Sequence, residues 1–417
     1  MQLKTILNRV EKHKSFVYGE VKLEEEEGRL RLEIEIKARA NGLMICSGCG
    51  EAAPGYDRLG KRWFEFVPLW MIAVFFVYEM RRVKCEKCGV KVERVPWAKG
   101  KSQLTTTYQW FLARWAKRLS WSEVAAAFNT SWEKVEESVK MAVEWGLENR
   151  DLSGVKAIGV DEIQWRRGHK YLTLVYQIDE GAKRLLWIGK DRTIETLTEF
   201  FEMFGAERSA LLEFVCSDMW KPYLTVIAEK AKQAVHILDR FHIMAKMNKA
   251  IDEVRAEEAR RLKEAGAEPL LKNSRWLLLK RPENQSEKQM GKLMELLKYN
   301  LKPVRSFLLR EEFQRFWEYR SSSWAAKFLD QWCSAVMRSR IEPMKKVAST
   351  LRNHRQLILN WFKAKGTLSS GKVEGLNNKV KLTMRKSYGF RTQKTITLAL
   401  YHTLGALPEP EFSHRFC

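Results

Sequence analysis

An ordered run of apolar strands between residues 155 and 243 is the feature that most restricts how this chain can fold. Three strands follow one another directly and predict a meander. A helix at Ile194–Phe204, a fourth strand, a second helix opened by Trp220–Tyr223 and a fifth strand come next. The predicted strands are Val155–Trp165, His169–Asp179, Arg184–Asp191, Leu212–Trp220 and Ala234–Ile243. The pattern therefore predicts an α/β segment in the middle of the chain.

Acidic residues lie near the ends of two of these strands. The order of strands and helices resembles the ribonuclease H-like arrangement, in which the first and fourth strands are neighbours. Asp161 lies toward the end of the first strand and Asp218 near the end of the fourth, so we expect them to meet at the centre of the sheet. The fifth strand carries Asp239 and His242, which we interpret as a supporting acid and a packed, hydrogen-bonded histidine.

A second polar group lies on a helix predicted between Ser369–Gly371, which form a turn and N-cap, and Tyr388–Gly389. An apolar stripe is formed at helical spacing by Val373, Leu376, Val380 and Met384. Another face carries Glu374, Asn377, Asn378, Lys381 and Arg385. A carboxylate can hold a divalent metal, and cations further along the helix can hold phosphates. A solvated face with helical ion pairs would give the same pattern.

Two strand aspartates and a helical glutamate, namely Asp161, Asp218 and Glu374, would form a carboxylate cluster. Such a cluster can hold two Mg²⁺ or Mn²⁺ ions about 3.5–4 Å apart, one activating a nucleophile and the other stabilising the leaving oxygen. Hard oxygen ligands favour these ions over zinc. Taken singly, each acid has a structural explanation as a cap or surface residue.

Size and charge restrict the class of protein. A chain of 417 residues has room for about two to four domains. Its 74 basic and 51 acidic residues give a net charge of +23, which predicts a polyanionic partner such as nucleic acid. An acidic membrane surface is the alternative, but the longest apolar run, residues 66–78, is too short to span a bilayer. The first residues contain no apolar signal segment, which favours the cytoplasm.

The cysteines form a separate pattern. Four of the seven lie in two C-x2-C pairs, Cys46 with Cys49 and Cys85 with Cys88. Two such knuckles suit a tetrahedral zinc ion, and a β-hairpin can fill the interval between them. Because four thiolates leave no ligand position open, the zinc would be structural. Free or buried thiols and an iron–sulfur cluster are the alternatives. The odd count and the lack of an export signal disfavour a disulfide framework.

The first 150 residues predict two further domains. Residues 1–100 are β-rich, with strict alternation in Arg29–Ile36, and a basic linker at Pro96–Ser102 follows. Between Leu119 and Leu147, a short helix, a turn at Asn129–Ser131 and a second helix have helix-turn-helix spacing. A three-helix core element is the alternative. The second helix is acidic on its exposed side, which argues against base recognition there.

The predicted architecture is multidomain α+β. From residue 243 to 365 the sequence is helical and basic, and we expect its tryptophans to lie in a core. The C-terminal segment Leu407–Cys417 predicts a loose tail. The expected domains are a zinc-binding β-rich domain at 1–100, a helix-turn-helix domain at 101–150, the first part of a ribonuclease H-like catalytic core at 151–245, an α-helical insertion at 246–365, and the final helices of the core at 366–417.

With these motifs in place, the chain resembles DDE transposases of insertion sequences, and most closely the ISL3 family. The segments that carry the resemblance are IGVDE around Asp161, SDMWKPY around Asp218, LDRFH at 238–242, and SSGKVEGLNNKVK with the following YGFR. The family combines an N-terminal zinc-binding region, a helix-turn-helix and a ribonuclease H-like domain with a helical insertion. The resemblance covers nearly the whole chain.

The resemblance implies that Asp161, Asp218 and Glu374 are the catalytic ligands of the two Mg²⁺ or Mn²⁺ ions, beside one structural Zn²⁺ at the cysteines. It implies hydrolysis at the ends of the element to free a 3′-OH, which then attacks a target phosphodiester. The Glu374-x6-Lys381 spacing is similar to the signature whose cation holds the terminal phosphate. The residues expected to contact DNA are Asn378, Lys381, Arg385, Lys386, Trp220 and Lys134.

The expected partners are double-stranded DNA, both transposon ends and target, and a second copy of the chain, because two ends must be brought together. No membrane partner is expected, and the expected location is the cytoplasm, at the nucleoid. Two rival functions stay open: a DNA-binding regulator derived from a transposase and lacking catalysis, and a host nuclease of ribonuclease H-like fold. The complete carboxylate set argues against the first, and the zinc motif, helical insertion and Glu-x6-Lys spacing argue against the second.

Overall fold

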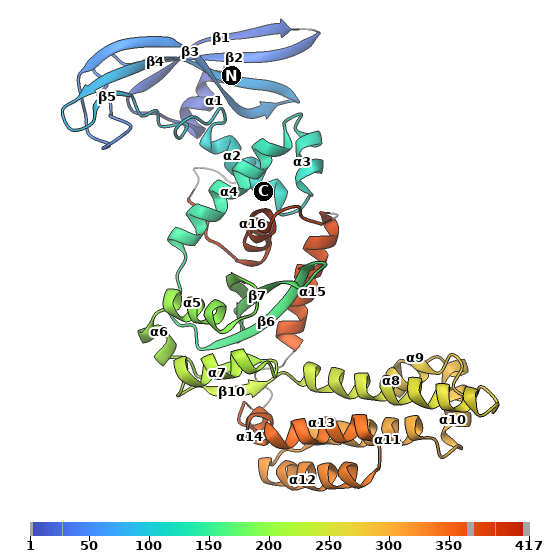
Figure 1. The fold of residues 1–417 in the computed structure, drawn as a ribbon. Helices are drawn as coiled ribbons and strands as arrows, with labels where there is room; N and C mark the ends of the chain where they lie inside the picture. The colour runs from blue at the N-terminus through green and yellow to red at the C-terminus, as the bar shows by residue number, and fades with distance from the viewer. Residues whose placement is uncertain (1–2, 27, 365–370, 388, 412–417) are drawn as a thin grey trace. The chain divides into compact units, whose positions relative to one another are not determined.

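The structure is a computed structural model that describes residues 3–26, 28–364, 371–387 and 389–411. The chain divides into two compact units (Figure 1). One contains Met1–Asp151 and Val380–Cys417, and the other contains Leu152–Lys379. No helix among the described residues has both the length and the apolar character needed to cross a bilayer.

The first unit contains a five-stranded, mostly antiparallel sheet in the order β1-β2-β4-β3, with β5 paired to β4. Within this sheet, β2 and β4 run parallel to each other. The strands are β1 (Phe16–Glu26), β2 (Arg29–Ala38), β3 (Gly55–Leu69), β4 (Ile72–Cys85) and β5 (Gly89–Val92). The predicted alternating segment lies in β2, where Ile34 and Ile36 are the buried residues.

The predicted basic linker at Pro96–Ser102 is partly a core segment. Trp97 is 1% exposed and its ring meets those of Phe16, Phe64 and Tyr78 edge to face, with centroid distances of 4.9, 6.0 and 5.3 Å. Such edge-to-face contacts stabilise the folded state by more than the burial of apolar area alone would give. A short helix that the sequence analysis did not predict, α1 (Leu3–Val10), adds Leu7 to the same core.

Three helices follow the sheet: α2 (Thr106–Ala116), α3 (Trp121–Ala127) and α4 (Trp132–Asn149). Ser120 and Glu123 form a capping box at the start of α3. Ser131 caps α4 as predicted, and Asn129 takes a positive φ of 47° in the turn between the two helices. This is the predicted helix, turn and helix, and Val135 and Val139 of α4 face inward.

The C-terminal part of the first unit packs on these helices. Thr395 of α16 (Gln393–Leu404) donates a 3.1 Å hydrogen bond to Glu136 of α4. Beyond α16, Glu409 accepts from Arg114 at 2.8 Å and from Lys117 at 2.7 Å. The prediction of a loose tail is therefore wrong for residues 407–411, which are anchored by Arg114 of α2 and by Lys117 directly after that helix. Residues 412–417 lie outside the described residues.

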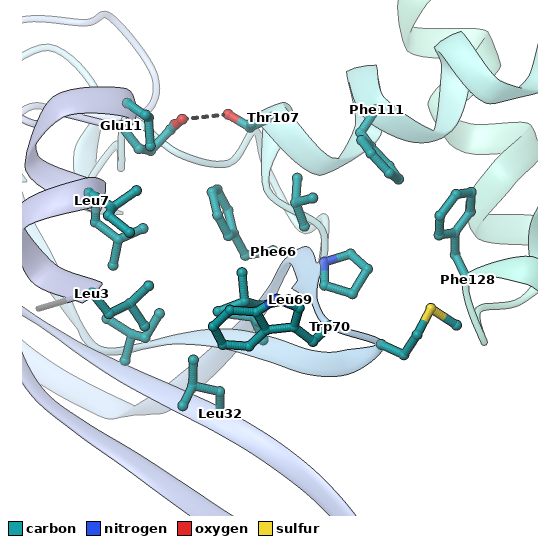
Figure 2. Close-up of a pocket in the computed structure, with 17 residues that line it drawn as sticks. Leu3, Leu7, Glu11, Leu32, Phe66, Leu69, Trp70, Thr107, Phe111 and Phe128 are labelled. Atoms are coloured by element: carbon teal, nitrogen blue, oxygen red, sulfur yellow. Dashed lines mark hydrogen bonds between the residues drawn. The ribbon is translucent and has the colours of Figure 1, made fainter. Parts of the chain in front are cut away.

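An apolar pocket of about 520 Å³ opens in the first unit beside the hairpin that joins β3 and β4 (Figure 2). Trp70 and Met71 form the hairpin turn with positive φ values, and they are 84% and 75% exposed. At the rim, Thr107 donates to Glu11 at 2.8 Å and so joins the segment after α1 to α2. Burial raises the pKa of this glutamate.

The second unit is built on a five-stranded sheet in the order β10-β9-β6-β7-β8. Its strands are β6 (Ala157–Arg166), β7 (Lys170–Gln177), β8 (Arg184–Lys190), β9 (Phe214–Ser217) and β10 (Val235–Leu238). The first three form the predicted antiparallel meander, and β9 and β10 are added in parallel to β6. Its helices are α5 (Ile194–Phe204), α6 (Ala206–Ala210) and α7 (Lys221–Lys230). Phenylalanines of α5 and Tyr223 of α7 share an apolar core with the sheet.

A helical segment follows β10, as predicted. It begins with the long helix α8 (Arg240–Glu264), against which α9, α11 and α13 pack (Figure 1). The other elements are α9 (Arg275–Leu279), η1 (Pro282–Asn284), α10 (Glu287–Leu297), α11 (Lys302–Gln314), η2 (Arg315–Glu318), α12 (Ser322–Arg338), α13 (Glu342–Asn353), α14 (Arg355–Leu359) and η3 (Asn360–Phe362).

The tryptophans of this segment differ in burial. Trp317 and Trp332 lie in its core, as expected for all of them. Trp276 and Trp324 are instead 58% and 61% exposed, each with a cation beside its ring, so the prediction is wrong for these two. Their cationic neighbours, Arg275 and Lys327, are close in sequence and accompany the rings on the surface.

Candidate active site and metal centre

The strand register brings Asp161 and Asp218 together. In the parallel pair β6 and β9, Gly159 is the partner of Cys216. Asp161 and Asp218 each lie two residues further along, so they are adjacent at the centre of the sheet. Asp161 is 5% exposed, and the backbone N–H of Trp220 donates to Asp218 at 2.9 Å. Burial raises the pKa of Asp218, and the charge of Asp161 raises it further.

The helix α15 (Gly371–Lys386) lies directly against β6. Gly159 has no side chain at this contact, and a Cβ there would approach the Cγ2 atom of Val373 to 2.6 Å. This close approach brings Asn377 to the carboxylates. Its amide nitrogen donates to Asp161, and its oxygen accepts from the hydroxyl of Tyr176 at 2.8 Å. Asn377 therefore fixes the orientation of the Asp161 carboxylate.

Glu374 lies one turn before Asn377 on the same helix and is exposed. Its charge reaches the same cluster, because it is one of the carboxylates that raise the pKa of Asp239. The apolar stripe predicted for this helix is observed, with Val373, Leu376 and Val380 buried. The predicted turn and cap at Ser369 and Ser370 lie outside the described residues.

Asp239 and His242 occupy a different place from the one predicted. The strand β10 ends at Leu238, and Asp239 caps α8 by accepting from the backbone N–H of Phe241 at 2.8 Å. The prediction of a fifth strand continuing to Ile243 is therefore wrong. The strand ends before Asp239 because this aspartate caps the helix that begins at the next residue. Burial is the main cause that raises the pKa of Asp239 to about 6.

The helical position of His242 aims it at the carboxylate cluster. Its Nε2 atom lies 3.6 Å from Oδ1 of Asp161. Burial by itself would lower the pKa of His242, but the contact with Asp161 and the neighbouring carboxylates outweigh burial and raise the pKa to about 9. At neutral pH the imidazole therefore carries a positive charge beside the buried aspartate.

A further acid lies next to Asp161 in β6. Glu162 pairs with Arg192 at 3.2 Å through one carboxylate oxygen. Its other oxygen, Oε2, is buried and has no hydrogen-bond partner among the described residues. Burial, together with the charges of Asp218 and Asp161, raises the pKa of Glu162 to about 7. The cluster thus concentrates more negative charge than its own cations neutralise.

The four predicted zinc ligands form a second cluster, in the first unit. The sulfur atoms of Cys46, Cys49, Cys85 and Cys88 all lie within 4.8 Å of one another. Sulfurs bound to zinc at ~2.3 Å in a tetrahedron stand about 3.8 Å apart, so this cluster fits such an ion. Cys46 and Cys85 are buried.

Local backbone geometry shapes the cysteine cluster. The N–H of Gly48 donates to the sulfur of Cys46 at 3.3 Å. Hydrogen bonds from the backbone of Cys49 and Gly48 lower the pKa of Cys46 to about 7. A Cβ at Gly48 would come within 2.9 Å of the Cys88 sulfur, so the first knuckle needs this glycine.

The residues predicted to contact DNA have different surroundings. Asn378, Lys381 and Arg385 are exposed on α15, and Trp220 is 37% exposed beside Asp218. Lys386, also exposed, donates to the backbone oxygen of Arg118. Lys134 on α4 is paired with Glu65. These roles stay predictions.

Sequence comparison gives the family. Residues 158–400, which include Asp161, Asp218 and Glu374, match the family described as transposase, of the DDE ISL3 type. The chain belongs to the ISL3 family of DDE transposases. The match begins at β6 and reaches α16, so the carboxylate cluster lies inside it and the cysteine cluster lies before it.

Curated relatives of this transposase match over almost their whole length. The transposase for insertion sequence element IS1001 of Bordetella parapertussis is 29% identical over 388 residues, covering 92% of this chain and 94% of the relative. The transposase for insertion sequence element IS1557 of Mycobacterium tuberculosis is 29% identical over 432 residues, covering 95% and 94%. The similarity therefore includes the N-terminal region that the family match does not reach.

Sequence reasoning did not assign roles to several residues that surround the carboxylates. Asn377 was placed on the correct helix face, but its bond to Asp161 joins residues 216 positions apart. Tyr176 and Arg192 had no sequence signal, because nothing local distinguishes them from structural residues. His242 had a signal in the LDRFH segment, which was interpreted as a strand.

Proposed function

We propose that this transposase binds the terminal inverted repeats of an insertion element and performs metal-dependent DNA strand cleavage and strand transfer. The observation that carries the proposal is the meeting of three distant segments at one point. The register of β6 and β9 sets Asp161 beside Asp218, and α15 packs against β6 so that Asn377, one turn after Glu374, holds Asp161.

The proposed ligands of two Mg²⁺ or Mn²⁺ ions are Asp161, Asp218 and Glu374. All donors are hard oxygens, the kind these ions prefer. The buried, unpartnered oxygen of Glu162 and the raised pKa values of the cluster fit a site that is completed by cations. When bound, the ions would activate the attacking oxygen and stabilise the leaving one. The strand order β10-β9-β6-β7-β8 supports assigning this unit to the ribonuclease H-like fold.

The side chains of the chain would have distinct tasks in this reaction. Asn377 and Tyr176 orient the Asp161 carboxylate. His242 places a positive charge against Asp161, where it limits the repulsion between neighbouring acids. Asn378, Lys381, Arg385 and Lys386 on α15, together with Trp220 and Lys134, would contact DNA. The proposed order is hydrolysis to free a 3′-OH at the element end, followed by attack of that hydroxyl on a target phosphodiester.

The remaining parts of the chain would serve recognition. We propose the five domains with the boundaries predicted from the sequence, except that Val380–Cys417 group with the first unit and not with the catalytic core. We also propose a structural Zn²⁺ at the four cysteines, and α3 and α4 as a helix-turn-helix. Because Glu136 of α4 bonds Thr395 and Lys134 is paired, part of that helix is committed to contacts inside its own unit. The chain would act as a homodimer on double-stranded DNA, in the cytoplasm at the nucleoid.

The test is a cleavage and strand-transfer assay on duplex DNA that carries the inverted repeats of the element, with Mg²⁺ or Mn²⁺. The natural protein is compared with Glu374→Gln, which keeps the size of the side chain and removes one anionic ligand. We expect metal-dependent nicking and joining by the natural protein and a loss of roughly a thousand-fold or more in the variant, because the metals supply several kcal/mol and each 1.36 kcal/mol is tenfold in rate.

The alternatives give different results in the same assay. Binding of the ends without cleavage by either protein would favour a catalytically inactive regulator. Cleavage without strand transfer would favour a nuclease of the same fold. Equal activity of both proteins would show that Glu374 is not a ligand.

A further inference from the structure

A pocket of about 270 Å³ opens beside Asp218, and the carboxylate cluster does not fill it. One wall is the turn after β9, and the other is the beginning of α8. The polar and aromatic lining residues are Asp218, Trp220, His242, Lys246 and Lys249. Because pockets that hold small ligands have volumes of ~300 Å³ or more, this pocket is at the lower end of that range. It has room for one flat ring, such as a nucleobase, and not for a DNA duplex.

The lysines give the pocket a cationic wall. Lys246 and Lys249 follow His242 at spacings that place all three on one face of α8. Both lysines are exposed, and no salt bridge joins either to an acidic side chain in the described part of the chain. The charge of Lys246 reaches both Asp218 and His354, which places its ammonium group close to the candidate active site. Such cations are suited to hold a phosphate group.

Trp220 gives the pocket an aromatic wall that is fixed in place. Its indole N–H donates to the backbone oxygen of Arg192 at 3.1 Å. The Arg192 guanidinium lies 4.7 Å from the centroid of the ring, and it is itself paired with Glu162. The ring is nevertheless 37% exposed and lines the pocket. An aromatic ring held in this way is a stacking surface for a nucleobase.

We propose that this pocket holds a single unpaired nucleotide next to the phosphate that is cut, with its base stacked on Trp220 and its phosphate between Lys246 and Lys249. The nucleotide is unpaired because a base inside a duplex has both faces covered by its neighbours. Asp218 forms part of both the pocket and the candidate active site, which sets the nucleotide beside the cut. The proposal rests on the cleavage function proposed above.

The test is a double-mutant cycle between protein and DNA. The binding of duplex element ends is measured without Mg²⁺ or Mn²⁺, for the natural protein and for Trp220→Ala. The DNA is either intact or carries one abasic residue, placed in turn at each of the positions that flank the cut. At one position we expect the abasic residue and Trp220→Ala each to weaken binding about five- to a hundred-fold, which is the range for loss of one base–aromatic stack. The two changes combined should weaken binding no more than either change alone, because both remove the same contact.

A second measurement tests the lysines. Replacing both Lys246 and Lys249 with alanine should lower the steepness of the salt dependence of binding by about 0.7 in log–log slope, because the two lysines hold one phosphate and each neutralised phosphate of single-stranded DNA contributes roughly 0.7. Lys263→Ala is the matched control, because Lys263 is exposed on the same helix about 21 Å from Lys249 along the axis. Trp324→Ala, which removes another exposed tryptophan, should leave the cycle with the abasic DNA unchanged.

The outcomes separate this proposal from the function on which it rests. Additive effects of Trp220→Ala and the abasic residue at every position would overturn the stacked nucleotide, while cleavage by the natural protein would leave the proposed function standing. An unchanged salt slope in the lysine variant would overturn the phosphate contact. If the natural protein does not cut the ends in the presence of either Mg²⁺ or Mn²⁺, both proposals fail together.

Discussion

The cysteine cluster and the carboxylate cluster are two candidate metal sites that are built in opposite ways. The cysteines lie between residues 46 and 88, and two knuckles aim all four sulfurs at one point. The carboxylates lie on β6, after β9 and on α15, and they meet only because the sheet and the helix bring these segments together. One site is determined by local geometry, and the other is determined by topology.

The two clusters also differ in how their charge is held. Backbone N–H groups lower the pKa of Cys46, which prepares a thiolate for a metal. Around Asp161, burial and repulsion raise the pKa values of Glu162 and Asp239, which opposes the charged state. The lesson is that a four-thiolate site is closed and stabilises its surroundings, whereas an open carboxylate site keeps unfavourable charge that cations and substrate must offset.

The largest expected effect concerns the cysteine cluster. Cys85→Ser should reduce bound zinc from one per chain to near zero and destabilise the first sheet, because structural zinc contributes on the order of 10 kcal/mol in small zinc domains. Metal analysis and thermal unfolding would measure both effects. Cys333→Ser is the matched control: its thiol is buried in the helical core and donates to the Ala348 oxygen, a bond that a hydroxyl can also make. Full zinc content in Cys85→Ser would contradict the cluster.

A smaller effect is expected when the support of Asp161 is removed. Asn377→Ala should lower cleavage about 10–100-fold at limiting Mn²⁺, as is usual for residues that orient metal ligands. Raising the Mn²⁺ concentration should recover part of the loss. The neighbouring Asn378→Ala should instead raise the DNA concentration needed for cleavage and leave the metal dependence unchanged, since Asn378 is exposed. If the two variants depended on Mn²⁺ and on DNA concentration in the same way, the results would contradict the assignment of Asn377 to positioning Asp161 and of Asn378 to contacting DNA.

The smallest expected effect comes from Asp239, whose pKa is raised from 3.8 to about 6 in the folded chain. A raised carboxyl pKa means that the folded state binds more protons between pH 4 and 6, so its contribution to stability falls as pH rises through that window. Asp239→Asn removes the charge and keeps a good helix cap. At pH 7.5 without divalent metal, we expect it to stabilise the protein by about 2 kcal/mol, somewhat less than two pKa units at 1.36 kcal/mol each would give.

The pH dependence provides the check on that prediction. The gain should fall toward zero by pH 4, where the folded natural protein is already protonated at Asp239. Thermal unfolding at both pH values would measure it. Saturating Mg²⁺ should also reduce the gain, since a cation offsets the repulsion among these acids. A gain that is equal at both pH values would show that the charge of Asp239 is not the cause.

Much of the architecture could be predicted from the hydrophobic periodicity and from residues that form helix caps and turns. The meander of β6, β7 and β8, the helix at Ile194–Phe204 and the cap at Ser131 are local patterns, and the structure contains them. The errors arose where a neighbour in space decides the outcome. Trp97 belongs to an aromatic core although its segment has the composition of a linker, and Glu409 is anchored by two cations almost 300 residues earlier.

By itself, the sequence determined which residues could carry the chemistry. The cysteine spacing, the strand-end aspartates and the Glu374 face are covalent or periodic features, so they are present before any tertiary contact forms. Only the tertiary structure decided what each carboxylate meets: Asn377 at Asp161, His242 turned toward it from α8, and Lys246 and Lys249 beside Asp218. The reason is physical, because burial and charge act through space between segments that the order of the chain leaves far apart.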